Sequence, residues 1–277
     1  LMSQERSKPG VMAASLFLAA LAYAFGLFAM AYAQGYLART LELRWLLIFS
    51  EAALALPALI VAFLLSERFP EIHRFPPLTP KTALLTVALG LAFWALSLGV
   101  FEAQFVFVKP PLEYLRQFQG LHDTLKPASA LGWVFSIAAI AVAPAICEEM
   151  LFRGLLTPVL RRAAGSVSAI VLSAALFGAI HVDALADGTK VYYRVPFAFV
   201  LGLLLAKLRI ESDSLWPPII AHATLNATTF CVVVLIAEEP TNTLPDPQPL
   251  VALGMLLAGS AVARALMTQI RPAAQPA

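Results

Sequence analysis

Charged residues are scarce in this chain of 277 residues. Asp, Glu, Lys and Arg together make up 13% of it, whereas hydrophobic residues make up 60%. A soluble domain is about half apolar and about one quarter charged, so the composition argues against a soluble globular fold. The formal net charge of only +2 gives no reason to expect nucleic acid or another acidic partner. The length is sufficient for one polytopic membrane domain.

Cysteine is also rare, and several familiar patterns are missing. The two cysteines, Cys147 and Cys231, both lie within apolar segments. They therefore indicate neither a disulfide framework nor a metal-binding pair of cysteines. The sequence contains no internal repeat, no heptad pattern and no HExxH motif. These absences leave hydrophobicity as the main guide to the fold.

Long apolar runs are what the sequence has in abundance. A helix that crosses a bilayer needs about 20 predominantly apolar residues. The sequence has four long apolar runs followed by four further ones, of which the sixth of the eight is short and the weakest; Pro, Gly or charged residues separate them. We therefore predict an all-α fold, a polytopic membrane helix bundle with about eight transmembrane helices. The runs cover residues 11–33, 43–65, 82–108, 131–160, 166–182, 195–208, 216–237 and 250–267.

The basic residues predict the orientation of this bundle. With eight helices both termini lie on one side, and that side collects twelve of the nineteen Lys and Arg residues. Loops that stay in the cytoplasm carry the excess of Lys and Arg, so both termini are expected there. The loop from Glu238 to Pro249 has acids and no base, as expected for the outer side. An Ala-rich composition with more Arg than Lys favours a bacterial inner membrane.

The segment APAICEEMLFRGLL, residues 143–156, places three charges in an apolar run. A charge at the bilayer centre costs about 2.5–3.5 kcal/mol, so it is usually paired or functional. Glu149 and Arg153 are four residues apart and share a helix face, whereas Glu148 points about 140° away from Arg153. We predict that Glu149 and Arg153 form a structural ion pair. Glu148 then remains available for chemistry.

Two histidines within the apolar runs give Glu148 its predicted partners. Thirteen residues separate Glu148 from a predicted turn at residues 161–168, and thirteen separate this turn from His181. At about 1.5 Å per residue, both side chains are expected about 20 Å from the turn and at the same depth. His222 and Asn226 share a helix face four residues apart. Alone, each histidine would more often be a hydrogen-bonded core residue.

The stretches EEMLFR, FGAIH and HATLN resemble the EExxxR, FxxxH and HxxxN motifs of the CAAX protease and bacteriocin-processing family. The resemblance covers about residues 130–236 and includes the order and spacing of the motifs. It implies an intramembrane endopeptidase. Carried over by position, it assigns water activation to Glu148 and His181, oxyanion binding to His222 and Asn226, and the structural pair to Glu149 and Arg153.

The chemistry of these residue types agrees with the implied activity. Peptide hydrolysis needs a base for water, such as Glu148 with His181. It also needs donors for the oxyanion, and His222 and Asn226 are suitable, at about 10²–10³ in rate per donor. We divide the chain into helices without a recognised motif (1–129), the catalytic core (130–236), and an outer loop, last helix and Pro/Ala tail (237–277). The expected partners are the lipid bilayer and a membrane-anchored protein or peptide substrate; the oligomeric state is not indicated.

Other interpretations remain open. Glu148, His181 and His222 could bind zinc as a two-His, one-Glu set, although we expect no cofactor. A thiol mechanism through Cys147 is disfavoured, because small cysteines are common in apolar helices. A non-enzymatic transporter or scaffold could use the same groups to relay protons, but the polar groups are confined to the second half of the chain.

Some residues near the motifs are expected to have no chemical role. Glu51 and Glu102 lie near predicted helix ends, which predicts exposure at the membrane interface. Phe152 and Phe177 are predicted to serve packing, and His73 and His122 are placed in loops.

Overall fold

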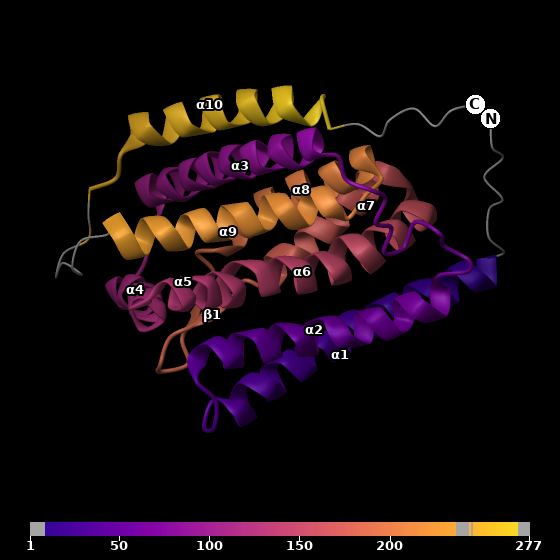
Figure 1. The fold of residues 1–277 in the computed structure, drawn as a ribbon, viewed down its shortest axis with the longest axis horizontal. Helices are drawn as coiled ribbons and strands as arrows, with labels where there is room; N and C mark the ends of the chain where they lie inside the picture. The colour runs from indigo at the N-terminus through magenta and orange to yellow at the C-terminus, as the bar shows by residue number, and fades with distance from the viewer. Residues whose placement is uncertain (1–8, 237–243, 245, 271–277) are drawn as a thin grey trace.

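The computed structural model describes residues 9–236, 244 and 246–270. The described chain is almost entirely helical (Figure 1), which confirms the predicted all-α membrane bundle. The predicted outer loop that begins at Glu238 lies largely outside the described residues, and the Pro/Ala tail wholly outside them. The helices are α1 (Pro9–Leu37), α2 (Leu43–Leu65), α3 (Pro80–Phe107), α4 (Leu112–Leu125), α5 (Ala130–Ile137), α6 (Ala143–Glu149), α7 (Thr157–Ala179), α8 (Val195–Ser212), α9 (Trp216–Ile236) and α10 (Pro249–Met267), with π-helical segments η1 (Ala138–Val142) and η2 (Met150–Leu156).

All eight predicted apolar runs are helical, and six helices are long and apolar enough to cross a membrane. The fourth of these, Ala130–Ala179, contains two of the predicted runs because the chain reverses at Gly165. Gly165 has φ 83° and ψ 171°, a conformation open almost only to glycine. The weak sixth run forms α8, which carries Lys207, Arg209 and Glu211 and is not among the six.

The helices stack in successive layers, visible in Figure 1 from α10 to α1. α10 packs on α3, α3 on α9, and α9 on η1 and α6; α2 packs on their other side and α1 covers α2. Glycine permits the close α3–α9 contact, since a Cβ on Gly90 would lie 2.6 Å from Cβ of Thr224. Small residues at helix interfaces let backbones approach in this way. The helix that carries the glutamates is therefore enclosed between α2 and α9.

Two elements near the motifs were not predicted. α4 is an amphipathic helix that packs against α9 and α2, so His122, which we placed in a loop, is a buried helical residue. Its Nδ1 lies 2.8 Å from the Phe118 carbonyl oxygen. The second element is a short antiparallel hairpin after α7, in which β1 (Asp183–Ala184) pairs with β2 (Lys190–Val191).

Candidate active site

The glutamates lie on a short α-helix, α6, between the two π-helical segments η1 and η2. Each π-helical segment ends just before a proline, Pro144 after η1 and Pro158 after η2. A proline has no N–H for the carbonyl four residues earlier, and its ring crowds that carbonyl. A wider turn relieves the crowding, and such π-bulges are frequent at functional sites. The local sequence thus explains why the helix is irregular on both sides of the glutamates.

Glu149 binds two partners rather than one. Its Oε1 accepts a hydrogen bond of 2.9 Å from Nη1 of Arg153, and Nδ1 of His222 lies 3.0 Å from the same oxygen. Glu149 and Arg153 have no solvent exposure, and His222 is 3% exposed. Arg153 also donates to the Gly202 carbonyl oxygen at 3.2 Å. The spacing of the residues suggested the arginine partner, but nothing in it indicated the histidine.

Glu148 points toward His222 from the other side. Its Oε2 lies 3.9 Å from Nε2 of His222, which is too long for a hydrogen bond. The residue is 8% exposed, and among the described residues this oxygen has no hydrogen-bond partner. A buried carboxylate oxygen without a partner is costly, and such groups mark functional sites. Oε2 of Glu149 also lacks a partner among the described residues, but its other oxygen is bound by Arg153 and His222, so the two acids differ in that Glu149 alone is held in an ion pair with the arginine.

His181 follows the end of α7, and its ring is oriented by the backbone. Nδ1 lies 2.7 Å from the Phe177 carbonyl oxygen. In the neutral ring an Nδ1–H donor leaves the lone pair on Nε2, so this nitrogen serves as an acceptor. No hydrogen bond or ion pair joins His181 directly to Glu148 in the described part of the chain. His181 does lie within electrostatic range of His222 and Arg153.

The ring of Phe177 lies in contact with His181, His222 and Arg153, a set of contacts that was not predicted from the sequence. Its ring contacts the rings of His181 and His222, with centroids 4.7 and 5.8 Å apart. The guanidinium of Arg153 lies over the same ring, 4.5 Å from its centroid. The aromatic face is electron-rich and favours a cation at this distance. The phenylalanine of the FxxxH stretch was the available signal for this contact.

Asn226 lies one turn beyond His222 on α9 and is half-buried. Its side chain makes no hydrogen bond to any described residue, whereas nearby threonines bond to carbonyls of their own helix. Thr224 donates to Ile220 at 2.8 Å, for example. The amide of Asn226 is therefore not engaged by any described residue.

Glu51 of α2 corrects one of our predictions. We expected it to be exposed at the interface, but its Oε2 is shielded from solvent and has no hydrogen-bond partner among the described residues. α2 packs along α6, and the Glu51 carboxylate lies within electrostatic range of Glu148 and Cys147. The error arose because distance from a predicted helix end says nothing about which helix covers the residue.

No group of three His, Cys, Asp or Glu side chains that could hold a metal ion exists among the described residues. In the suggested zinc set of Glu148, His181 and His222, each histidine directs Nδ1 to a protein oxygen, leaving only Nε2 for a metal. This orientation does not by itself exclude a metal, because a zinc-bound histidine commonly binds through one nitrogen and directs the other to a protein oxygen. That the chain works without a cofactor stays a prediction.

Residues 130–228 match the family model described as type II CAAX prenyl endopeptidase, Rce1-like. Comparisons with curated proteins and with solved structures gave no match. The matched range runs from α5 into α9 and contains all six predicted site residues. It confirms the resemblance inferred from the motifs and, at the level of the family, supports an intramembrane protease. The six long apolar helices indicate an integral, multi-pass membrane protein.

Proposed function

We propose that this protein is an intramembrane endopeptidase that cleaves a peptide bond of a membrane-associated protein or peptide, without a cofactor. The observation that carries the proposal is the position of His222 between the two glutamates. Nδ1 of His222 is held by Glu149 at 3.0 Å, while Nε2 faces Glu148 at 3.9 Å. Residues from two of the three motifs therefore meet at one point, within the range matched by an endopeptidase family.

Water activation is assigned to Glu148 and His181. The Glu148 carboxylate accepts a proton from water, and Nε2 of His181 accepts a hydrogen bond from the same water. The resulting hydroxide forms a bond to the carbonyl carbon of the substrate, which becomes a tetrahedral oxyanion. The proton held by Glu148 then passes to the leaving amine nitrogen as the C–N bond breaks.

Oxyanion stabilisation is assigned to His222 and Asn226. With Nδ1–H directed to the Glu149 carboxylate, His222 offers a second N–H at Nε2 only as the imidazolium. Glu149 orients the ring through Nδ1, and the Asn226 amide adds a neutral donor one helix turn away. In this proposal Glu149 has a role beyond charge neutralisation, because it holds the oxyanion donor in its orientation.

The proposal is tested by comparing the membrane proteomes of cells that carry wild-type protein, Glu148→Ala or His181→Ala. Uncleaved precursors of membrane-anchored proteins are expected to accumulate with both variants, since loss of acid–base catalysis costs about 10²- to 10⁴-fold in rate. Cys147→Ala is the matched control, because it alters the neighbouring residue and should remain active. Activity in Glu148→Ala together with loss in Cys147→Ala would reverse the assignment.

Two further outcomes address the alternatives. Purified protein should continue to cleave an identified precursor in the presence of a zinc chelator. Inactivation by the chelator and rescue by zinc would favour the zinc-dependent version of the protease. If Glu148→Ala alters ion or proton flux and no precursor accumulates, the transporter alternative would replace the protease proposal.

A further inference from the structure

The carbonyl groups of η2 accept hydrogen bonds from residues outside the helical hairpin that α6, η2 and α7 form around Gly165. η2 begins directly after Glu149, so its geometry determines how both glutamates are oriented. Nε2 of His73 lies 3.1 Å from the Met150 carbonyl oxygen, and the backbone N–H of His73 donates to the Gly154 carbonyl oxygen at 3.4 Å. Nε of Arg209 donates to the Arg153 carbonyl oxygen at 3.2 Å. Two residues distant in the sequence thus bind three carbonyls of one π-helical segment.

These bonds compensate for a feature of the local sequence. Pro158 has no N–H to offer the carbonyl four residues earlier, which is that of Gly154. The N–H of His73 occupies this position instead. A buried carbonyl group without a hydrogen-bond donor destabilises the fold by about 1–3 kcal/mol. The N–H of His73 removes this penalty at Gly154.

The fit between His73 and η2 is close. A Cβ added to Gly154 would lie 2.3 Å from Cδ2 of His73, so only glycine leaves room for the imidazole ring. His73 itself has φ 48°, a left-handed conformation that is uncommon for a residue other than glycine. The loop between α2 and α3 is thus bent so that this ring enters the space above Gly154.

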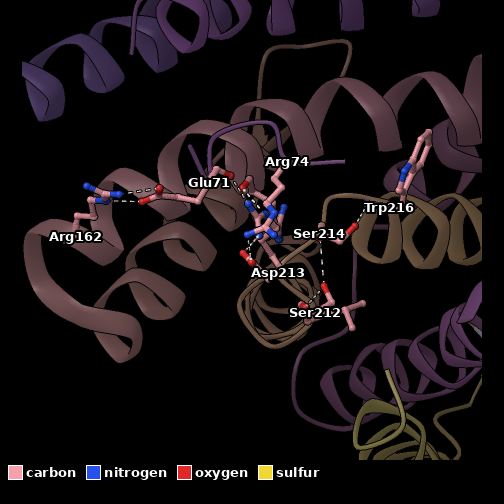
Figure 2. Close-up of polar contacts among 10 residues, drawn as sticks. Glu71, Arg74, Arg162, Ser212, Asp213, Ser214 and Trp216 are labelled. Atoms are coloured by element: carbon pink, nitrogen blue, oxygen red, sulfur yellow. Dashed lines mark hydrogen bonds and ion pairs between the residues drawn. The ribbon is translucent and has the colours of Figure 1, made fainter. Parts of the chain in front are cut away.

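The loop and Arg209 are held by an ionic network on the side of the hairpin turn (Figure 2). Arg162 of α7 pairs with the Glu71 carboxylate, with Nη2–Oε2 at 2.9 Å, and Arg74 pairs with Asp213 at the end of α8. Arg209, 3% exposed, donates from Nη2 to the Glu71 carbonyl oxygen. The loop is therefore tied to α7 and to the end of α8 on both sides of His73.

We infer that His73 and Arg209 are positioning residues, which hold η2 in its π-helical form and thereby orient Glu148 and Glu149 toward His222. A π-turn contains one residue more than an α-turn. Return to a regular α-helix would rotate the glutamates by about 100° relative to α7. Neither His73 nor Arg209 makes a hydrogen bond or ion pair with the side chain of His181, His222 or Asn226, so both act through the backbone carbonyls of η2.

The inference rests on the proposed function only for its effect on catalysis. Alkylation of Cys147 provides a second measurement, which reports the orientation of α6. Cys147 is half-buried and precedes Glu148, so a rotation of α6 changes its accessibility. In a Cys231→Ala background it is the single thiol of the chain. Its alkylation rate by a small maleimide reports the orientation of α6 without any turnover.

Four proteins are compared in this background: the parent, His73→Ala, His73→Gln and Lys207→Gln. His73→Ala should lower kcat about 10-fold or more, leave KM within about twofold, and change the alkylation rate of Cys147 at least about threefold. His73→Gln should restore both values toward the parent, because its amide can donate to the Met150 carbonyl. Lys207→Gln, the matched control, breaks the solvent-accessible Lys207–Glu211 pair of α8, which takes no part in this network, and should leave both values unchanged.

The outcomes separate the inference from the proposed function. If the parent cleaves nothing but alkylation follows the expected order, the protease proposal fails and the positioning role stands. If cleavage is normal in the parent and His73→Ala changes neither kcat nor alkylation, the positioning role is wrong. Loss of folded protein in His73→Ala and His73→Gln alike would also overturn it, because His73 would then serve folding rather than orientation.

Discussion

A single oxygen of Glu149 connects the stability of the site to its chemistry. Oε1 lies 2.9 Å from Nη1 of Arg153 and 3.0 Å from Nδ1 of His222. All three residues are buried, so loss of one partner leaves charge uncompensated in a low-dielectric interior. The arginine keeps this carboxylate in place, and the carboxylate in turn orients the histidine.

Removing the charge of Arg153 alone should therefore impair folding. Removing the charges of both Arg153 and Glu149 should restore folding but not activity. Arg153→Leu is expected to lower folded yield, since breaking a buried pair costs about 3–5 kcal/mol. Adding Glu149→Gln should recover much of that yield, and a double-mutant cycle of thermal stability measures the coupling. Cleavage should not return, because the variant lacks the Glu149 carboxylate that orients the His222 ring.

Glu148→Gln is the matched variant at the neighbouring position. It should fold with normal yield and show no turnover, because the Glu148 carboxylate is not needed to neutralise Arg153. If Glu148→Gln unfolds the protein while Glu149→Gln leaves it folded but inactive, the roles of the two glutamates have been exchanged.

His73 should make the stability of the protein depend on pH. Burial, opposed by the hydrogen bond to Met150, lowers the pKa of His73 below its ordinary value of 6.5. The neutral form is thus the one that stabilises the fold, and its contribution is complete above pH 6.5 and is lost as the pH falls toward the folded-state pKa. Wild type should lose more thermal stability than His73→Gln between pH 7 and pH 5. Equal losses in the two proteins would contradict this expectation.

At the scale of the elements, the hairpin depends on one glycine. Gly165 reverses the chain with φ 83°, and nothing lies within 4 Å of a Cβ built there. A substitution would therefore act through backbone conformation alone. Residues forced into such regions cost about 1–3 kcal/mol each.

Gly165→Ala should accordingly lower the free energy of unfolding by about 1–3 kcal/mol. Gly254→Ala is the matched control, because Gly254 also has open space around it but lies within helix α10. There alanine should be neutral or stabilise by about 0.5–1 kcal/mol. Thermal unfolding in detergent measures both variants. The same loss in both would show that conformation at the turn is not the cause.

At the scale of the whole molecule, the candidate site lies nearer the open end of the helical hairpin than its turn at Gly165. His181 directly precedes the β1–β2 hairpin, whereas Arg161 and Arg162 lie at the opposite end, near Gly165. The distribution of basic residues predicts that the arginine end faces the cytoplasm. On this topology the substrate would approach from the outer side.

Cysteine labelling tests this orientation. In a background without native cysteines, Ala186→Cys, which replaces an exposed residue of the β1–β2 turn, should react with a membrane-impermeant maleimide on intact cells. Arg161→Cys, exposed at the other end, should react only after the cells are permeabilised. The opposite pattern would reverse the predicted topology.

Local sequence was sufficient for the helical framework and for part of the site. Each apolar run becomes a helix because in a membrane the backbone must satisfy its own hydrogen bonds. The spacing of Glu149 and Arg153 predicted their contact, because residues four apart meet on one helix face. The turn near residue 165 followed from the break between two apolar runs. These properties depend on neighbours within a few turns of the chain.

Tertiary structure alone decided which groups from different helices meet. The second partner of Glu149 comes from α9, the half-buried Glu51 from α2, and the donors to η2 from the α2–α3 loop and α8. Helical periodicity gives the direction of a side chain about its own axis but not the rotation or depth of the helix that faces it. Those depend on close packing, such as that of Gly154 against the His73 ring, and on the extra residue of each π-turn.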